Sequence, residues 1–351
     1  MIDLYRLAGP VLRSLPPELA HRLALRALAL GLAGRPPGVD DPILAVDLWG
    51  KRFPNPVGLA AGFDKHGEAP AQALALGFGL AEVGSVTPRP QSGTQGPRLF
   101  RLTEDNAVIN RMGFNSEGHA AVAARLARRP KGMLGINLGR NKDSADAGLD
   151  FAAGVRAFGT MADYLVVNLS SPNTPGLRAL QGKAPLEALL GRINEARAML
   201  PNDGPPLLVK IAPDLVDDEL ADIAAVTMAM RVDGLIVSNT TIARPDTLRS
   251  PHKGEGGGLS GAPLFVPSTR VLARMFVLTE GKMPLIGCGG IASGEQAYAK
   301  IRAGASLVQL YTALVYDGPA LVTRIKRDLA ALLRRDGFAK LSDAVGVDTK
   351  V

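Results

Sequence analysis

The chain has 351 residues, of which 46% are hydrophobic and only 5% aromatic, a composition that indicates a globular protein with a largely aliphatic core. Its 40 basic and 33 acidic residues give a net charge of +7, which suits an anionic membrane surface or anionic ligands better than nucleic acid, because aromatic residues are few and no nucleic-acid motif is present. The single Cys288 excludes an internal disulfide, and the four histidines lack metal-ligand spacing, so no metal site is expected.

Residues 1–33 are predicted to form two short helical pieces, broken at Gly9-Pro10 and at Pro16-Pro17. The pattern contains no cleavable signal, because no extended apolar core follows a basic start. Its longest uncharged apolar stretch, 27–33, is far shorter than the about 20 residues of a membrane span. An amphipathic pair lying on a membrane and a pair packed on its own domain fit the pattern equally well. Residues 34–42, rich in Gly, Pro and Asp, are predicted to be a linker.

From residue 43 a repeating order begins, in which a short apolar run precedes a polar, glycine-bearing loop and a helix-patterned segment. Eight apolar runs occur, at 56–60, 80–83, 133–136, 164–167, 207–209, 234–237, 284–286 and 307–310. Alternating strands and helices imply parallel strands joined by right-handed crossovers. The sequence therefore predicts an α/β fold, an eight-stranded parallel (β/α)8 TIM barrel over 43–336.

Helices between these runs are predicted at 67–76, 116–128, 186–200, 217–230, 266–278 and 294–302. Residues 43–53 are predicted to be a small hairpin at one end of the barrel, and 320–333 a closing helix. The tail 337–351 is assigned no role. A doubly wound open sheet is the alternative fold, but no G-x-G-x-x-G fingerprint follows the first strand.

Polar residues follow the eight runs. In a parallel barrel the carboxyl ends of the strands meet at one face, where barrel enzymes carry out their chemistry. The loops at this face supply many amides and hydroxyls, few acids, and the lysines Lys65 and Lys210. Amides and hydroxyls can read the edges of a planar heterocycle, and lysines can hold negative charge on a ring or a carboxylate. This face therefore suits a flavin together with a small cyclic imide.

Three of these loops carry further signals. The segment NLSSPNTPG at 168–176 is stiffened by two prolines, although by itself it favours an ordinary polar turn. The glycine-rich segment 287–294 and Tyr311-Thr312 follow the last two runs, with the glycines of 256–261 available beside them. Because barrels often bind phosphate with the loops after strands seven and eight and a helix N-terminus, a phosphate site is predicted there.

Several longer motifs point to one family. They are NPVGLAAG at 55–62, DK at 64–65, GSVTPRPQ at 84–91, PRLFR at 97–101, INRMGFN at 109–115, NLSSPNTPGLR at 168–178, VKIAPD at 209–214, SNTT at 238–241, GGLSG at 257–261 and LVQLY at 307–311. Together and in this order they resemble the dihydroorotate dehydrogenase family, class 2, the membrane-associated and quinone-dependent form. The resemblance runs from about residue 18 to 335.

The resemblance implies an FMN enzyme of pyrimidine (UMP) synthesis that oxidises (S)-dihydroorotate to orotate and passes the electrons to a membrane quinone. In that family a base in the loop after the fourth strand takes a proton from substrate C5, while a hydride goes from C6 to the flavin. Ser171 holds this position, and serine in place of cysteine is the class 2 pattern. Because a serine hydroxyl is a poor base at neutral pH, Ser171 is expected to act through a hydrogen-bonded relay to water.

The same motif positions imply the binding residues. The implied orotate contacts are Lys65, Asn110, Arg111, Met112, Gly113, Phe114, Asn168, Asn173, Asn239 and Thr240. The implied FMN contacts are Ala61, Gly62, Ser85, Asn137, Asn168, Lys210, Ser238, Gly261, Gly290, Tyr311 and Thr312. Lys210 would neutralise the negative charge that reduced flavin gathers near N1. His21 and Arg101 match the positions that line the family's quinone tunnel, whereas Cys288 is expected to be a small buried residue.

Two other functions compete with this one. A class 1-like flavin barrel that uses fumarate or NAD would carry cysteine at 171 and lack the amphipathic start, and the sequence has neither feature. A non-catalytic barrel that binds a phosphate ligand would not need Ser171, Lys65 and Lys210 together. We therefore expect a peripheral membrane protein at the cytoplasmic face of a bacterial inner membrane. The sequence specifies no oligomeric state, and a monomer is compatible with it.

Overall fold

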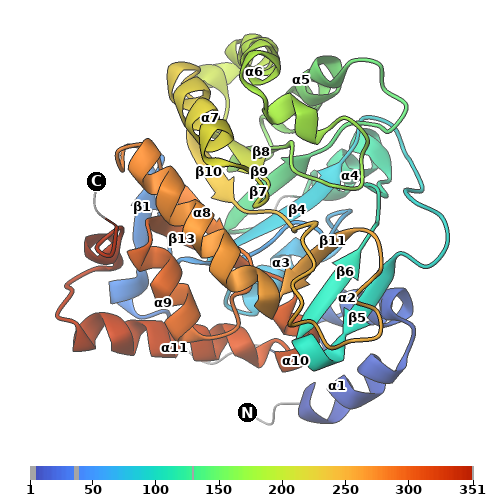
Figure 1. Ribbon diagram of the computed structural model, residues 1–351, viewed down its shortest axis with the longest axis vertical. Helices are drawn as coiled ribbons and strands as arrows, with labels where there is room; N and C mark the ends of the chain where they lie inside the picture. Colours follow the sequence, from blue (N-terminus) through green and yellow to red (C-terminus); the bar gives the residue numbers. More distant parts are fainter. Residues whose placement is uncertain (1–4, 35–38, 129, 350–351) are drawn as a thin grey trace.

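Eight parallel strands form a closed barrel at the centre of the computed structural model, which describes residues 5–34, 39–128 and 130–349 (Figure 1). The strands are β3 (Val57–Leu59), β4 (Leu80–Val86), β7 (Met133–Leu138), β8 (Tyr164–Asn168), β9 (Leu207–Ile211), β10 (Gly234–Val237), β12 (Leu285–Cys288) and β13 (Ala305–Leu310). Each corresponds to one of the eight apolar runs, and β13 pairs with β3 to close the ring. Nearly all of their residues are buried, as expected for strands with helices outside and packed side chains inside. The predicted barrel is confirmed.

Helices cover the outside of the barrel. They are α3 (Pro70–Ala75), α4 (Gly118–Leu126), α5 (Ala147–Phe158), α6 (Lys183–Ala198), α7 (Asp217–Ala229), α8 (Phe265–Leu278), α9 (Gly294–Arg302), α10 (Ala313–Asp317) and α11 (Ala320–Arg335). No helix is predicted from the sequence at α5. Its glycines weaken the helical pattern, yet a Cβ atom at Gly154 would lie 2.8 Å from the Leu138 side chain. Close packing of α5 on β7 therefore requires glycine at position 154. Glycine is also the residue type that weakens the helical pattern in the sequence.

A short hairpin closes the amino-terminal end of the barrel, as predicted for residues 43–53. Its strands β1 (Val46–Leu48) and β2 (Lys51–Phe53) pair antiparallel. The turn between them places both Trp49 and Gly50 at positive φ, which matches the twist of a two-residue hairpin. The Trp49 ring lies 6.1 Å from that of Tyr164, and its indole N–H donates to the Asp233 carbonyl at 2.9 Å. The hairpin is therefore fixed beneath the starts of β8 and β10.

A second sheet of three antiparallel strands stands beside the opposite end of the barrel. It contains β5 (Leu99–Leu102), β6 (Ala107–Asn110) and β11 (Gly258–Gly261), in the order β11-β6-β5. The sequence predicts loops for these segments, and the structure corrects this. The pairing of β11 with β6 joins residues about 150 positions apart, and such nonlocal pairing leaves no local periodicity to detect. The strands β5 and β6 pair locally but have only four residues each. Leu102, Ile109 and Leu259 are fully buried and form a small core of their own.

The N-terminal helices α1 (Tyr5–Ser14) and α2 (Pro17–Ala29) lie beside β5 and β6. The break predicted at Gly9-Pro10 is wrong, because α1 continues through Pro10. Contacts that hold it include hydrogen bonds to carbonyls of α10, from the Tyr5 hydroxyl to Val315 (2.7 Å) and from Arg13 to Tyr316 (3.2 Å). The break at Pro16-Pro17 is correct, and Pro17 opens α2 as a first-turn proline. Within the described residues, no helix is both long and apolar enough to cross a bilayer.

Parts of three predicted segments lie outside the described residues: 1–4 of 1–33, 35–38 of the linker 34–42, and 350–351 of the tail 337–351. The described tail, to which no role was assigned, packs on the barrel. Leu341 and Ala344 are fully buried, and the Gly346 amide donates to the Ile301 carbonyl at 3.1 Å. Arg302 of α9 pairs with Asp348. The tail thus stabilises α9, one of the helices behind the glycine-rich loop.

Candidate active site

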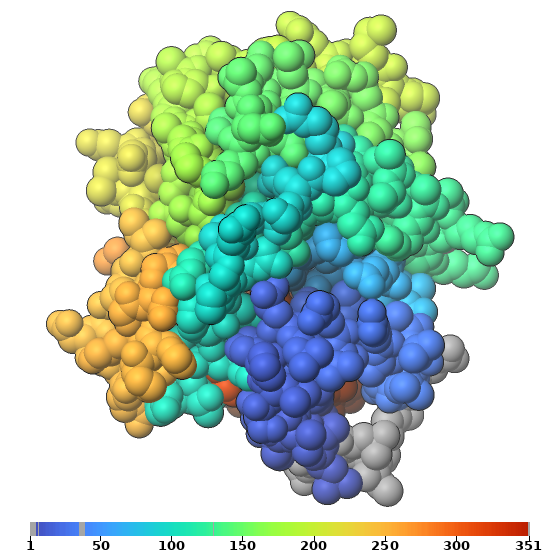
Figure 2. Space-filling view, turned by 90° about the vertical axis from the view of Figure 1, so that its right-hand side faces the viewer, coloured from blue at the N-terminus to red at the C-terminus, as the bar shows by residue number. Residues whose placement is uncertain are grey.

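A cavity of about 1550 Å³ opens at the carboxyl ends of the barrel strands. Loops after six of the eight strands line its floor together with Lys210 of β9, the three-stranded sheet forms one wall, and α1 and α2 form another. Figure 2 shows this face, with the helices in dark blue between the teal segment near residue 100 and the lighter blue segment near residue 70. The cavity therefore runs from the barrel axis to the N-terminal helices.

Most of the predicted site residues meet in this one cavity. Those that line it are Ala61, Gly62, Lys65, Ser85, Asn110, Met112, Gly113, Phe114, Asn168, Ser171, Asn173, Lys210, Ser238, Asn239, Thr240, Gly261, Gly290, Tyr311 and Thr312, together with His21 and Arg101. Asn137 and Arg111 do not line it. The Arg111 guanidinium pairs with Glu255 at 2.7 Å and lies 4.5 Å from the centre of the Phe100 ring, so its side chain gives no support to a substrate contact.

Asn137 contributes from behind the cavity wall. It is fully buried and donates to the Glu82 carboxylate at 2.8 Å, while its own oxygen accepts from the Ser85 hydroxyl and from Asn168 (3.1 Å). Asn168 also donates to Ser85 Oγ at 2.9 Å. These bonds leave the three side chains little freedom to rotate, because buried polar groups must stay paired. Asn137 thus orients two residues that do line the cavity.

Sequence reasoning missed Glu82, a buried acid in the middle of β4. Its carboxylate accepts from Gln309 at 2.6 Å and from the Tyr164 hydroxyl at 3.2 Å. Burial, together with the nearby Glu82 charge, raises the pKa of Tyr164 well above its usual value, so the phenol stays a donor. Its apolar neighbours in the run 80–83 gave no sign of this role. An isolated acid in an otherwise apolar strand is the signal that could have found it.

The loop after β8 is held to its neighbours by side-chain amides. Asn239, which follows β10, donates to Asn168 Oδ1 (3.2 Å) and to Ser170 Oγ (3.0 Å). Asn173 donates to the carbonyl of Asn110 at 3.2 Å, and its backbone amide donates to Ser171 Oγ at 3.3 Å. Ser171 therefore sits in an ordered loop with its hydroxyl at the cavity.

Two lysines give the cavity a positive floor. Lys65 donates to the Gly62 carbonyl at 2.6 Å. Burial lowers the pKa of the Lys65 ammonium to about 8, and repulsion from Arg98 adds to the shift. Lys210 is 4% exposed, and no described residue accepts a hydrogen bond from its ammonium or pairs with it. Because Lys210 lines the cavity, this position fits a ligand with an anionic edge.

The end of the cavity near β12 and β13 has the features of a phosphate site. Gly261, Gly289 and Gly290 have φ values of 99°, 114° and 76°, which disfavour any other residue. A Cβ atom at Gly290 would lie 2.5 Å from Phe265 Cα. Ser293 caps α9 by accepting from the Gln296 amide at 3.2 Å. Close backbone approach and a nearby helix N-terminus favour an anion.

Gln309 supplies a further polar group for a ligand. Its side chain lines the cavity, and among the described residues its buried Oε1 has no hydrogen-bond partner. A buried acceptor without a donor is unfavourable. This oxygen, the unpaired Lys210 ammonium and the glycine-rich end together fit a ligand that carries an N–H donor, an anionic ring edge and a phosphate, as FMN does.

His21 and Arg101 lie where α2 and β5 meet the cavity. His21 Nδ1 is 3.3 Å from the Tyr311 hydroxyl, and its ring packs edge-on against Phe63. Burial lowers the pKa of His21 to about 3, with a further contribution from Lys65, so the imidazole is neutral. Arg101 donates to the carbonyls of Leu12 (3.1 Å) and Leu15. It therefore fastens the end of α1 to β5.

This fold and site define a (β/α)8-barrel enzyme whose cavity has a glycine-rich end suited to an anionic group beside a second polar region. The family model described as "Dihydroorotate dehydrogenase" matches residues 43–333. The chain belongs to the dihydroorotate dehydrogenase family, and it is an oxidoreductase of that family's quinone-dependent class.

Similar proteins support the class as well as the family. The dihydroorotate dehydrogenase (quinone) of Rhodospirillum rubrum is 61% identical over 99% of this chain and 95% of its own length. The mitochondrial enzyme of Oryza sativa is 52% identical over 98% of this chain and 80% of its own. A crystal structure of DHODH from Eimeria tenella in complex with ferulenol has a TM-score of 0.94, at 43% identity over 97% of this chain and 99% of that one. The resemblance inferred from the motifs is confirmed.

Proposed function

We propose that this enzyme oxidises (S)-dihydroorotate to orotate in pyrimidine synthesis, with FMN as its redox cofactor, Ser171 as the catalytic base and a membrane quinone as the electron acceptor. The observation that carries the proposal is the meeting of Ser171, Lys65 and Lys210 in one cavity that ends in glycine-rich loops. A barrel that only bound a phosphate ligand would have no need for all three. Family membership supports the same reaction.

The residues divide between two ligands. Gly261, Gly290 and Thr312 would hold the FMN phosphate, and Lys210 would face the ring edge that becomes negative on reduction. FMN, when bound, supplies the hydride acceptor. Lys65, Asn110, Asn173, Asn239 and Thr240 would hold dihydroorotate through its carboxylate, carbonyl and N–H groups. With the substrate fixed in this way, C5 would face Ser171.

Ser171 then takes the C5 proton. A serine hydroxyl is a weak base, so the proton must move on through a relay to water. The backbone amide of Asn173 donates to Ser171 Oγ at 3.3 Å, which steadies the oxygen and favours negative charge on it as the proton arrives. Loss of the proton at C5 supplies the electrons for the C5–C6 double bond of orotate as the hydride leaves C6.

The helices α1 and α2 support a membrane quinone as the electron acceptor. Six of the thirteen large, exposed hydrophobic side chains in the described residues lie between positions 7 and 32: Leu7, Val11, Leu19, Leu23, Leu30 and Leu32. Arg22 and Arg26 on α2 are also exposed. Apolar side chains flanked by arginines suit the surface of an anionic bilayer. A peripheral position at the cytoplasmic face of a bacterial inner membrane would bring quinone to the His21 side of the cavity.

The visible spectrum of the purified protein tests the function directly. We expect flavin absorbance in the protein as isolated, and bleaching of that absorbance when dihydroorotate is added without oxygen. Subsequent addition of a quinone should restore the flavin absorbance. A colourless protein that binds phosphate ligands would instead favour the non-catalytic barrel, and a flavin that NADH but not dihydroorotate bleaches would point to another substrate.

Lys65 gives the proposed substrate site a pH dependence. Its pKa of about 8 means that the ammonium is charged below this pH and neutral above it, so orotate should bind more weakly as pH rises through about 8, by up to about tenfold per pH unit. Titrating the flavin absorbance with orotate measures this. Lys65→Arg, which stays charged, should make orotate affinity independent of pH in this range. A pH-independent affinity in the unmodified enzyme would show that Lys65 does not bind the carboxylate of the substrate.

A further inference from the structure

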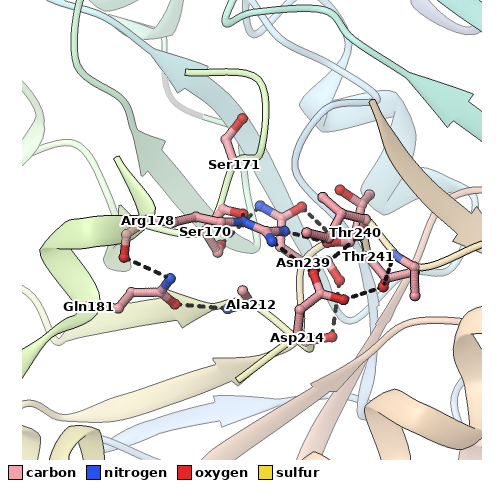
Figure 3. Close-up of polar contacts among 12 residues, drawn as sticks. Ser170, Ser171, Arg178, Gln181, Ala212, Asp214, Asn239, Thr240 and Thr241 are labelled. Atoms are coloured by element: carbon pink, nitrogen blue, oxygen red, sulfur yellow. Dashed lines mark hydrogen bonds and ion pairs between the residues drawn. The ribbon is translucent and has the colours of Figure 1, made fainter. Parts of the chain in front are cut away.

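Arg178 lies at the junction of the loops that follow β8, β9 and β10 (Figure 3). Its Nε donates to the Ser170 carbonyl at 3.1 Å, and its two terminal nitrogens donate to Asp214 Oδ2 at 2.8 Å and to the Thr240 carbonyl at 3.0 Å. The side chains of Arg178 and Asp214 are only 22% and 17% exposed. One guanidinium therefore connects three loops, and two of them, those after β8 and β10, carry proposed substrate contacts.

The position of the two carbonyls gives these bonds their importance. The Ser170 oxygen belongs to the peptide plane that leads into Ser171, so fixing it fixes the direction in which the Ser171 side chain leaves the backbone. The Thr240 oxygen belongs to a residue whose backbone amide donates to Asn239 Oδ1 at 2.8 Å. Arg178 thus sets where the proposed base stands relative to two proposed substrate contacts.

The far side of the ion pair is fixed as well. Asp214 accepts from the Thr241 hydroxyl and from the Ile242 amide at 3.1 Å. Gln181 donates to the Arg178 carbonyl at 3.3 Å and accepts from the Ala212 amide at 3.0 Å. Neither Arg178 nor Asp214 lines the cavity, so neither is placed to touch a ligand. Their action on the reaction must pass through the residues that they hold.

The geometry requires arginine. A guanidinium presents several N–H donors in one rigid plane, whereas a lysine ammonium is a compact charge on a flexible stem. The three acceptors of Arg178 belong to three different segments. A lysine at 178 could keep the ion pair to Asp214 but could not span both carbonyls with fixed directions. The substitution Arg178→Lys therefore separates the charge of the side chain from its hold on the two carbonyls.

We propose that Arg178, held by Asp214, is a positioning residue that keeps Ser171 and the Asn239–Thr240 segment in register for proton removal. The inference rests on the proposed function. A displacement of about 1 Å in a reacting group can cost up to about 100-fold in rate, and release of two loops at once is a displacement of this kind. Binding of FMN should continue, because the proposed phosphate contacts Gly261, Gly290 and Thr312 and the proposed ring contact Lys210 accept no hydrogen bond from Arg178.

The chain offers a matched control for the ion pair. Arg197 pairs with Asp233 at 2.9 Å, its side chain is 14% and that of Asp233 32% exposed, and it also donates to the Pro205 carbonyl at 3.2 Å. Asp233 precedes β10 and Pro205 precedes β9, so this pair lies at the amino-terminal end of the barrel. Losing either pair should lower thermal stability, but only the pair at the carboxyl end should affect the reaction.

The experiment compares Arg178→Met, Arg178→Lys and Arg197→Met as FMN-loaded proteins. Single-turnover stopped flow gives the rate constant of flavin reduction by dihydroorotate, absorbance titration gives orotate affinity, and melting gives stability. We expect both methionine variants to melt earlier, and only Arg178→Met to reduce slowly, by about 10- to 100-fold, and to bind orotate more weakly. Arg178→Lys should recover stability without recovering the rate.

Asp214→Asn completes the design, because it keeps the shape of the side chain and removes the charge. It should slow reduction in the same direction as Arg178→Met, and the two effects should not add in the double variant, since the residues act as one unit. Wild-type rates in both Arg178→Lys and Asp214→Asn would overturn the positioning role even if Arg178→Met failed to fold. If dihydroorotate did not bleach the wild-type flavin at all, the proposed function itself would fail instead.

Discussion

Replacing Ser171 by alanine should slow the reduction of bound flavin by dihydroorotate by about two to four orders of magnitude, the range expected when a positioned general base is lost. The substitution removes one oxygen from a loop whose other anchors remain. Asn168, Asn173 and Asn239 keep their hydrogen bonds to partners other than Ser171 Oγ. Their persistence means that the change should leave the loop in place and FMN bound.

Single-turnover stopped flow isolates this step from reoxidation. Orotate affinity in Ser171→Ala should stay close to that of the unmodified enzyme, because the proposed substrate contacts do not include Ser171. Ser171→Cys is the informative comparison, since a thiol has an ordinary pKa of about 8.5. It should reduce faster than the alanine variant as pH rises toward that value. Near-normal reduction in Ser171→Ala would assign the base elsewhere.

The barrel could be predicted because its information is local. Each strand is an apolar run followed by a turn signal, and the fold places every such turn on the same face. The site residues next to those turns, such as Lys65 and Lys210, were accessible for the same reason. They follow β3 and end β9, and both line the cavity.

What the sequence did not reveal depends on partners from distant strands. Glu82 is one acid in an apolar run until Asn137, Tyr164 and Gln309 converge on it from three other strands. Arg178 stands at the end of a recognised motif, but its role follows from carbonyls and a carboxylate on three loops. Interactions of this kind become visible only when the ring of strands is closed.

The N-terminal helices show the same limit. Their amphipathic pattern fitted a membrane-lying pair and a packed pair equally, and the structure contains features of both. Leu25 and Leu28 of α2 are buried in the main hydrophobic core, and Glu18 pairs with Arg98 at 2.9 Å. Deleting residues 1–33 would therefore remove part of the core, and lost activity would not distinguish membrane docking from lost stability.

Substitutions at the exposed surface of α1 and α2 distinguish membrane docking from a contribution to stability. Changing the exposed Leu7, Leu19, Leu23 and Leu30, which are 74%, 36%, 40% and 76% exposed, to serine leaves the buried leucines in place. We expect thermal stability, FMN content and reduction by dihydroorotate to stay near wild type. Reoxidation by a long-chain quinone in liposomes should fall by about 100-fold, because membrane docking raises the effective concentration of the acceptor by about this much or more. A water-soluble dye acceptor should still work.

The control is a second set of serine substitutions at exposed apolar residues of the barrel. Leu149, Met199, Val216 and Val266 are 56%, 83%, 64% and 73% exposed, and changing them should affect neither liposome binding nor either acceptor. Anionic liposomes should bind the unmodified enzyme and the control set alike, and salt should weaken that binding because Arg22 and Arg26 contribute screened attraction. If the variant with serine at Leu7, Leu19, Leu23 and Leu30 lost reoxidation by the dye and by the quinone equally, the leucines would act through folding. Full reoxidation by the quinone in the same variant would place the quinone entrance away from α1 and α2.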